Sequence, residues 1–457
     1  MIVLSVTKIQ ALLVVLFALI SCVFVLSYPA LSNDGYYRTY DSKKSSDEIK
    51  KDNWQSSVSG NTTSGNTAID QAIHGEKLRD LKTPQTVYES HTSDHGKTSH
   101  QGPASTHADH SPHQNHVSEH SSEHGTHGAR APIGVMGDHL LHKKGQWMLS
   151  YRHMYMNMEG NRIGDDDISP ERIVTTVPNR FSGQPMQPPT LRVVPTEMDM
   201  HMNMFGGMYA AADNVTLMAM VNYHSKEMDH ITFAGGMGTT QLGRFTTQTE
   251  GFGDVKLSAL VALYEDDIHK VHLNLGLSIP TGSITEKDKI LTPMGMTPEV
   301  RLPYAMQLGT GTFDALPGIT YTGQKGDFSW GAQYKGSIPL EDENDEGYRY
   351  SDKHEGTAWV AYQWAPWIST SLRVAGSTQD SIDGIDSEIV APVQTADPDN
   401  YGGERIDLLF GVSMAGQQGA LSGHRFAFEI GTPIYQDLNG PQMETDLILT
   451  VGWQKAF

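Results

Sequence analysis

The sequence is poor in cysteine, in positive charge and, beyond its first 32 residues, in long apolar runs. Its one cysteine, Cys22, excludes an intramolecular disulfide framework and a zinc site made of several thiolates. Lys and Arg number 33 against 53 Asp and Glu, and the formal charge of −20 argues against a nucleic-acid partner. No later stretch approaches the roughly 18 to 20 consecutive apolar residues that a helical membrane span needs.

Residues 1–32 have the order of a secretory signal peptide. Lys8 precedes an apolar stretch over 11–26, and Ala30 and Ser32 supply small residues at the end. This order predicts export, with cleavage after Ser32. Two alternatives stay open: lipidation of Cys22 after cleavage at a lipoprotein box, and an uncleaved membrane anchor.

The next segment, residues 33–131, is predicted to be a disordered arm. It holds only eight Leu, Ile or Val residues and no Phe, so it cannot bury enough apolar area to offset the entropy of ordering. Ten of its residues are closely spaced histidines, and neutral imidazole binds Cu(II), Ni(II) and Zn(II). The predicted ligands are His91, His95, His100, His107, His110, His113, His116, His120, His124 and His127. The alternative is a polar linker whose histidines have no specific role.

Residues 132–457 change to an alternating pattern. Val271, Leu273 and Leu275 fall at every second position, with polar residues between them, which is the period of a strand that has one apolar face. About twelve such segments can be counted, starting near residues 146, 198, 215, 253, 269, 312, 328, 357, 367, 405, 424 and 445.

The connections between these segments alternate between long and short. Long links are predicted at about 159–196, 225–250, 280–311, 339–355, 378–404 and 434–443, with short links between them. An outer-membrane barrel has this arrangement, with an even strand number, short periplasmic turns and long extracellular loops. We therefore predict an all-β fold, a transmembrane antiparallel up-and-down β-barrel of about 12 strands. A secreted β-sandwich or solenoid is the competing fold, because alternation would then separate a core face from a solvent face.

Charged residues on the polar register of these strands are the predicted lumen residues. They are Arg152, Lys256, Arg373, Asp407 and Asp446. An Arg or Lys that faced lipid at the middle of a bilayer would cost about 2 to 4 kcal/mol, so a polar lumen is where a barrel can hold them.

Methionine is concentrated between Met136 and Met237, which hold fifteen of the 21 methionines. Thioether sulfur is a soft ligand that suits Cu(I). Met154, Met156, Met218, Met220 and His224 lie on polar registers and are the predicted metal ligands of the lumen, whereas Met198–Met204 would face lipid if Asp199 and His201 faced the lumen. Methionine is also an adaptable apolar side chain, so ordinary barrel surface is the alternative.

Three short motifs resemble a known family. They are Gly251-Phe252-Gly253-Asp254, Pro280-Thr281-Gly282 and Gly309-Thr310-Gly311 followed by Asp314. Over roughly 133–457 the chain resembles the Gram-negative outer-membrane "transporter" family associated with the MetA pathway of phenol degradation. The resemblance implies a barrel with a transport role and brings no substrate and no functional residues. The motif glycines and Pro280 suit strand ends and tight turns, so we expect them to be architectural.

No catalytic motif is recognisable, since there is no nucleophile elbow, no zinc-protease motif and no phosphate loop. The sequence therefore predicts a non-enzymatic transporter in the outer membrane of a Gram-negative bacterium, with the histidine arm in the periplasm. Its expected partners are the lipid bilayer, a small-molecule or metal-ion solute, and the outer-membrane assembly machinery, which would recognise the terminal Phe457. Copper or zinc is the expected metal. The alternative function is metal sequestration by the arm, with the barrel as its anchor.

Overall fold

The computed structural model describes residues 130–141 and 143–457. The predicted leader, almost all of the predicted arm and the ten arm histidines lie outside the described residues. None of the described helices is long and apolar enough to span a membrane.

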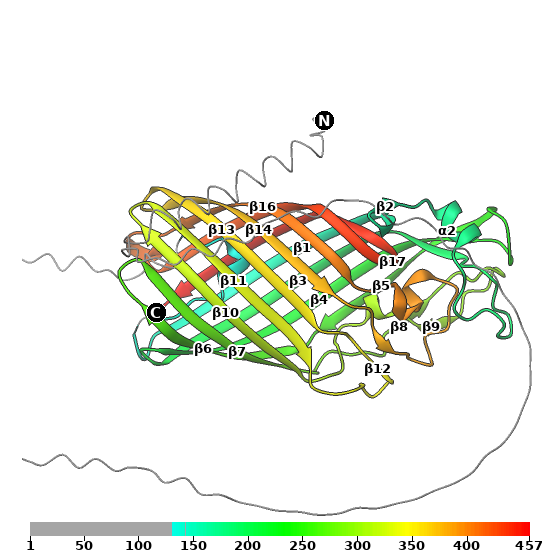
Figure 1. Ribbon diagram of the computed structural model, residues 1–457, viewed down its shortest axis with the longest axis horizontal. Helices are drawn as coiled ribbons and strands as arrows, with labels where there is room; N and C mark the ends of the chain where they lie inside the picture. Colours follow the sequence, from blue (N-terminus) through cyan, green and yellow to red (C-terminus); the bar gives the residue numbers. More distant parts are fainter. Residues whose placement is uncertain (1–129, 142) are drawn as a thin grey trace, which may run out of the picture. The chain divides into compact units, whose positions relative to one another are not determined.

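The described chain forms a closed antiparallel β-barrel (Figure 1). Neighbouring strands pair in the order β17, β16, β14, β13, β11, β10, β7, β6, β4, β3 and β1, and β17 pairs with β1 to close the ring. The strands of the ring are β1 Trp147–Gly164, β3 Val193–Ala212, β4 Val215–Phe233, β6 Val255–Glu265, β7 His269–Ile279, β10 Asp314–Lys325, β11 Phe328–Pro339, β13 Lys353–Ala365, β14 Ile368–Gln379, β16 Gly403–Ala415 and β17 His424–Ala456.

The last strand, β17, crosses the barrel twice. Its first half pairs with β16 up to Leu438, and its second half pairs with β1 up to Ala456. The start of the first half and the end of the second half lie side by side, because the Ala456 N–H donates to the Gly423 carbonyl, 3.1 Å away. Gly440 has a φ of +67°, as the tight reversal between the halves requires. The eleven labelled strands therefore supply twelve crossings, which confirms the predicted barrel of about 12 strands.

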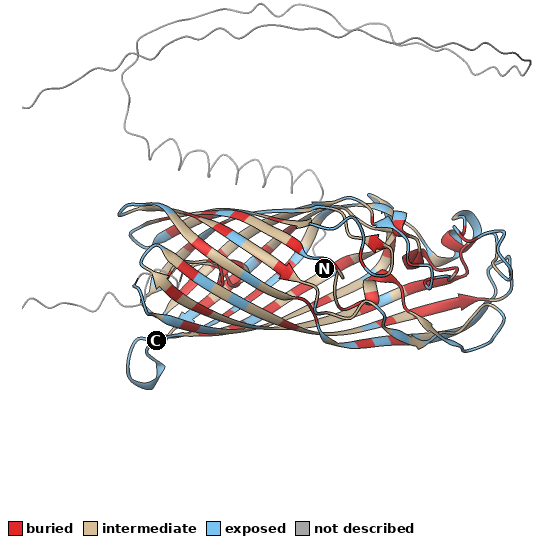
Figure 2. Ribbon diagram, turned by 90° about the horizontal axis from the view of Figure 1, so that it is seen from below, coloured by how far each residue is buried: buried red, intermediate tan, exposed pale blue. Residues whose placement is uncertain are grey.

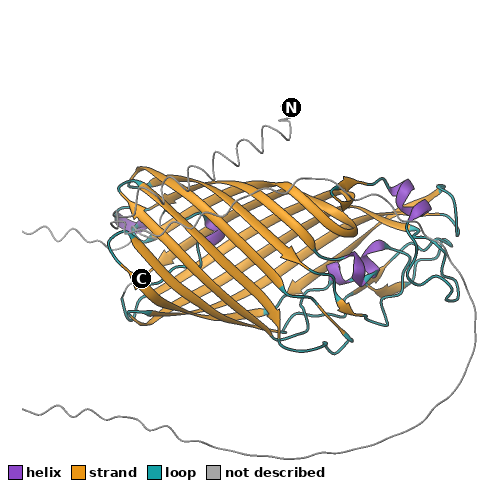
Figure 3. Cartoon of the chain, viewed as in Figure 1, coloured by secondary structure: helices purple, strands orange, loops and turns teal. Residues whose placement is uncertain are grey.

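Short and long connections lie at opposite ends of the barrel. The short turns follow β3, β6, β10, β13 and β16, and we call this side the short-turn end. The other end carries the long loops with most of the remaining elements (Figure 3). These elements are β2 Asp166–Asp167, α2 Pro170–Thr176, β5 Gln241–Phe252, β8 Lys287–Lys289, β9 Glu299–Arg301, η3 Tyr304–Met306, β12 Tyr348–Arg349, β15 Asp383–Gly384, η4 Gln394–Ala396 and η5 Pro398–Asn400. One short helix, η6 Gly419–Leu421, lies between β16 and β17, and another, η2 Ile133–Val135, precedes β1.

Two of the predicted long links were wrong. Residues 225–250 are mostly strand, because β4 continues to Phe233 and pairs with β5, which extends the line of β6 beyond the break at Gly253-Asp254. Residues 434–443 are the end of a hairpin inside β17. Polar stretches, for example Thr246–Thr249 and Asn439–Gln442, interrupt in these segments the alternation by which a strand is found in a sequence.

Burial alternates along each strand, as Figure 2 shows. On β7 the side chain of Leu275 is 54% exposed on the outside, whereas His272, Asn274 and Ser278 are buried. The barrel therefore has apolar side chains outside and polar side chains inside, the reverse of a water-soluble protein.

Candidate functional site: the barrel lumen

The interior face is fixed by cross-strand register. Directly paired residues on neighbouring strands share a face of the sheet, so each pairing carries the interior assignment to the next strand. On this basis Arg152, Lys256, Arg373 and Asp407 point into the lumen, in line with their partners Met204, Ser278, Leu409 and Ala375.

Asp446 does not share this placement, and its prediction as a lumen residue was wrong. The β1–β17 register shifts between Leu447, opposite Asn157, and Thr445, opposite Met158, which leaves Asp446 unpaired in a bulge. Thr445 is buried and accepts a hydrogen bond from Arg405, whereas Asp446 is exposed. A bulge inserts one residue and so moves the next side chain to the other face.

A short segment before β1 enters the lumen. We call residues 130–141 the plug. At its start the Arg130 guanidinium donates to the carbonyl of Gly326, in the short turn between β10 and β11, at 2.5 Å. At its end the Leu141 N–H donates to the Thr216 hydroxyl at 3.0 Å. Between these points Ile133 and Met136 are buried. The plug therefore spans the lumen near the short-turn end, from the turn between β10 and β11 to the second residue of β4.

One carboxylate, Asp138, fixes the middle of the plug. It forms a salt bridge with Lys335 of β11 and lies close enough to Arg152 of β1 for their charges to interact. Asp138 is buried, and an ionised group removed from water needs such partners. The sequence analysis missed Asp138 and Lys335. The available signal was a lone acid that follows the apolar run of residues 133–136.

Other lumen charges form salt bridges, either between strands or within one strand. Arg373 of β14 forms a salt bridge with Glu429 of β17, and Arg405 pairs with Asp407 at 3.1 Å on β16. Lys353 and Glu355 pair at 2.8 Å on β13. No salt bridge within the described residues includes Lys256. Salt bridges therefore compensate several of the lumen charges, whereas Lys256, Lys226 and Arg152 face the interior without a salt-bridge partner among the described residues.

The plug divides the free space of the lumen. A chamber of about 160 Å³ lies between the plug at Gly134 and the walls of β11, β13, β14 and β16, lined by Lys335, Glu355, Arg373 and Arg405. A smaller cavity of about 80 Å³ lies nearer the short-turn end and is lined by Asp138, His139 and His272. Both cavities border the plug, which contributes Gly134 and Val135 to the larger one and Asp138 and His139 to the smaller one.

The predicted metal ligands of the lumen wall also point inward. Met154 and Met156 of β1, Met218 and Met220 of β4, and His224 share the interior face, and the Arg152 guanidinium lies 3.4 Å from the Met220 sulfur. Met198–Met204 face the lumen as well, because Met202 pairs with Met154 and Met200 with Met156, so the condition under which they would face lipid does not hold.

The acidic register of β3 is the outer one. The Tyr155 hydroxyl donates to Asp199 at 2.6 Å, and the His153 and His201 rings stack with their centroids 5.5 Å apart. Hydrogen bonds to hydroxyl, amide and imidazole neighbours keep these polar groups on the outside of the barrel.

Exposed apolar and aromatic side chains cover the outside of the barrel. Near the short turns the exposed aromatics are Trp147, Tyr264, Phe328, Trp364 and Trp367. Above them Leu217, Leu257 and Leu275 are exposed on neighbouring strands, and they line a shallow outer groove of about 830 Å³. An apolar band with an aromatic girdle is the surface that a transmembrane barrel presents to lipid.

The three family-like motifs meet at one point of the wall. The Asp254 carboxylate accepts hydrogen bonds from the N–H groups of Gly282 and Thr310, both at 2.9 Å. Gly282 and Gly309 pack backbone to backbone, so a Cβ on Gly309 would lie 2.7 Å from the Gly282 carbonyl oxygen. This junction, which we call the motif knot, joins the ends of β5, β6, β7 and β10 and supports the architectural interpretation of the motifs.

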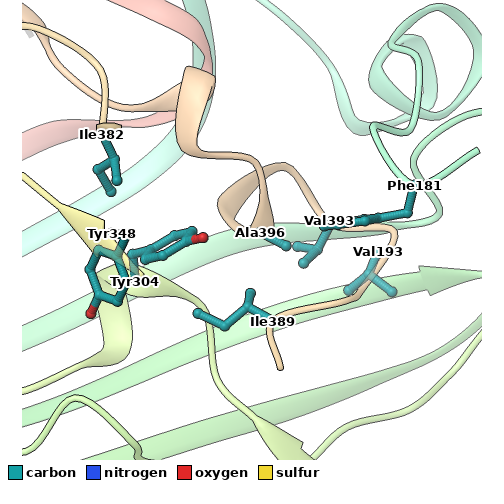
Figure 4. Packing of buried hydrophobic residues seen from close by; sticks show 8 residues of the cluster. All are labelled: Phe181, Val193, Tyr304, Tyr348, Ile382, Ile389, Val393 and Ala396. Atoms are coloured by element: carbon teal, nitrogen blue, oxygen red, sulfur yellow. The ribbon is translucent and has the colours of Figure 1, made fainter. Parts of the chain in front are cut away.

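The long loops form an ordered cap with its own core. Figure 4 shows Tyr304, Tyr348 and Ile382 beside Ile389, Val393 and Ala396, which come from loops far apart in sequence. Burial raises the pKa of Tyr304 to about 12. Arg301 contacts Glu346 at 2.5 Å and Asp386 at 2.8 Å; burial lowers its pKa, but these two carboxylates outweigh burial and hold it above its ordinary value.

The described part of the chain holds no cluster of His, Cys, Asp and Glu side chains that could bind a metal ion. Within residues 130–141 and 143–457, no three His, Cys, Asp or Glu side chains are grouped as metal ligands. A metal bound here would need the thioethers as ligands or the histidines outside the described residues.

Several solved structures of outer-membrane channels are similar to this chain in fold. An outer membrane channel from Pseudomonas putida F1 is 12% identical, with a TM-score of 0.45, over 70% of this chain and 98% of that chain. A TodX monoaromatic hydrocarbon channel variant is 10% identical, with a TM-score of 0.38, over 72% and 93%. A Pseudomonas aeruginosa FadL homologue is 10% identical, with a TM-score of 0.34, over 68% and 89%. No family model and no curated protein matches the sequence.

Proposed function

We propose that this chain is an outer-membrane channel for small solutes, held closed in this conformation by the plug. One observation carries the proposal: a closed ring of strands has apolar side chains outside and paired charges inside. A bilayer requires such closure, because it offers unpaired backbone groups no water. A soluble sandwich or a barrel enzyme would not need a charged lumen shut by its own chain.

The position of the plug supports one orientation of the barrel in the membrane. Arg130, the first described residue of the plug, contacts the short turn at Gly326, so the plug begins at the short-turn end. Short turns face the periplasm in bacterial barrels, which supports a periplasmic place for the histidine arm. A protease added to intact cells is expected to cut the long loops and to spare the arm; cleavage of the arm from outside would contradict this orientation.

Reconstitution tests the channel directly. The full-length chain in planar bilayers is expected to show infrequent openings, and liposomes containing it should admit small solutes slowly. Recovery of the chain as a water-soluble protein without detergent would contradict the proposal. A barrel that inserts into bilayers and never conducts, even with the plug weakened, would also contradict it.

The histidine arm supports a second activity. Ten imidazoles within residues 91–127 can coordinate Cu(II) or Zn(II) without a preformed site. Zn(II) titration of the full-length chain, compared with a variant in which the ten histidines are serine, measures the binding that the arm contributes. Tight arm binding together with a silent barrel would favour sequestration over transport.

Phe457 is the proposed signal to the assembly machinery. Its ring is exposed, and its N–H donates to the Trp147 carbonyl at 2.8 Å, at the short-turn end. Phe457→Ala is expected to lower the amount of folded barrel in the membrane while the folded fraction keeps its stability. An unchanged yield in the membrane would contradict recognition of this residue.

A further inference from the structure

We propose that the lumen wall formed by β1, β3 and β4 binds Cu(I), at a site made by Met154, Met202 and His224. These three residues lie directly opposite one another on three neighbouring strands, Met154 beside Met202 and Met202 beside His224. Each comes from a different strand, and all three share the interior face. The sheet therefore sets two thioethers and one imidazole in a row across the wall.

Strand spacing makes this row a feasible ligand set. Residues directly opposite on antiparallel strands have Cβ atoms about 4.5 to 5.5 Å apart, within reach of a flexible thioether on either side of a shared ion. The Nδ1 atom of His224 is buried and has no hydrogen-bond partner among the described residues. Buried polar atoms in proteins are nearly always satisfied, so this imidazole is available to a ligand.

The row is part of a longer methionine track. Twelve methionines, four on β1, five on β3 and three on β4, share the interior face of the three strands. They are Met148, Met154, Met156, Met158, Met198, Met200, Met202, Met204, Met208, Met218, Met220 and Met228. At one end of the track Met148 and Met208 pack with Leu141 of the plug. At the other end Met198 and Met228 pack with Met306 under the cap.

Burial singles out the middle of the track as the accessible part. Met148, Met208, Met198 and Met228 are fully buried at its ends, whereas Met154, Met202 and His224 are only partly buried. Closely packed thioethers at the ends serve as apolar filling. The partly open row in the middle is where an ion from the lumen can reach sulfur and nitrogen.

The charges beside the row select the ion. Lys226 and Arg152 lie on the same interior face, on either side of the row, and no carboxylate lies within it. Positive neighbours and the absence of oxygen anions disfavour Mg²⁺, Ca²⁺ and other hard divalent ions. Thioether and imidazole ligands suit Cu(I), which is soft and carries a single charge.

The test measures Cu(I) itself on the full-length chain in detergent, against a chromophoric Cu(I) chelator, with X-ray absorption to detect sulfur ligands. The parent is expected to bind Cu(I) with thioether sulfur. Met154→Leu with Met202→Leu preserves apolar volume and is expected to lower the sulfur signal and raise the Kd about tenfold or more. His224→Gln is expected to weaken binding while the sulfur signal is kept. Cys22 and the arm are the same in every variant and contribute equally.

Met294→Leu with Met296→Leu is the matched control, because both methionines are exposed in the loop between β8 and β9. The control should bind as the parent does. Unchanged affinity and sulfur signal in the Met154/Met202 variant would overturn the site, as would loss of binding in the control alone. Binding is measured without transport, so a barrel that binds Cu(I) but never conducts would overturn the channel and leave this site standing.

Discussion

Asp138 in the plug forms a salt bridge with Lys335 on β11, and this pair ties a segment that precedes the barrel to the far wall of its lumen. Asp138 is buried beside Arg152 as well, so one carboxylate lies between two cations contributed by different strands. The plug has no other acidic side chain. Asp138 is therefore the acidic anchor of the plug, whereas the Arg130 guanidinium holds its start at the Gly326 carbonyl.

Asp138→Asn is expected to loosen the plug. Loss of a charge-assisted hydrogen bond costs about 1.5 to 3 kcal/mol, which corresponds to roughly a tenfold or larger rise in the open fraction. Single-channel recording measures the open fraction of each variant. Lys335→Gln should have a similar effect, and the double variant should be less than additive. Lys144→Gln, at an exposed position, is the control, and equal conductance in all four variants would show that the pair does not hold the plug.

Lys256→Glu is expected to shift ion selectivity toward cations. Lys256 points into the lumen from β6 and has no salt-bridge partner among the described residues, so its charge acts on passing ions. In the Asp138→Asn background the cation-to-anion permeability ratio should rise about twofold or more, as judged from reversal potentials in a salt gradient. Lys287→Glu makes the same charge change on an exposed loop residue. An equal shift for both variants would place selectivity outside the lumen.

Arg301→Met is expected to destabilise the cap more than Arg349→Met. Arg301 and its partner Asp386 are 9% and 1% exposed, whereas Arg349 and Asp383 are 32% and 59% exposed. Removing one partner of a buried pair costs about 3 to 5 kcal/mol, whereas an exposed pair contributes about 0 to 1 kcal/mol. Limited proteolysis of the loop over residues 380–402 should accelerate only in the Arg301 variant. Equal cleavage of both variants would contradict the burial argument.

Asp254→Asn is expected to lower barrel stability by about 1 to 3 kcal/mol, because an amide cannot accept all the hydrogen bonds that the carboxylate accepts in the motif knot. Heat-modified gel mobility in detergent gives the unfolding temperature. Asp267→Asn changes an exposed acid in the short turn after β6 and should leave that temperature unchanged. If the Asp254 variant is as stable as the parent, the knot does not support the wall.

The strands and their order could be predicted from the sequence wherever one face is apolar. Val271, Leu273 and Leu275 face outward as the alternation indicates, and the short turns are where polar clusters interrupt the pattern. The pattern fails over β5 and the end of β4, where polar stretches such as Thr246–Thr249 interrupt the alternation and only pairing defines the strand. It also fails at Asp446, because a bulge changes the face of one residue without leaving a mark in the hydrophobic pattern.

The sequence by itself determined the barrel class, the alternation of long and short connections and the inward face of β6 and β7, because a period of two follows from strand geometry alone. Only the tertiary structure decided which face of β3 is internal, since that depends on the register of β3 with β1. The methionine track depends on the same register. The plug and the Asp138–Lys335 pair were also decided only by the tertiary structure. The pair joins residues 197 positions apart, and no local pattern encodes a contact that forms only when the ring of strands has closed.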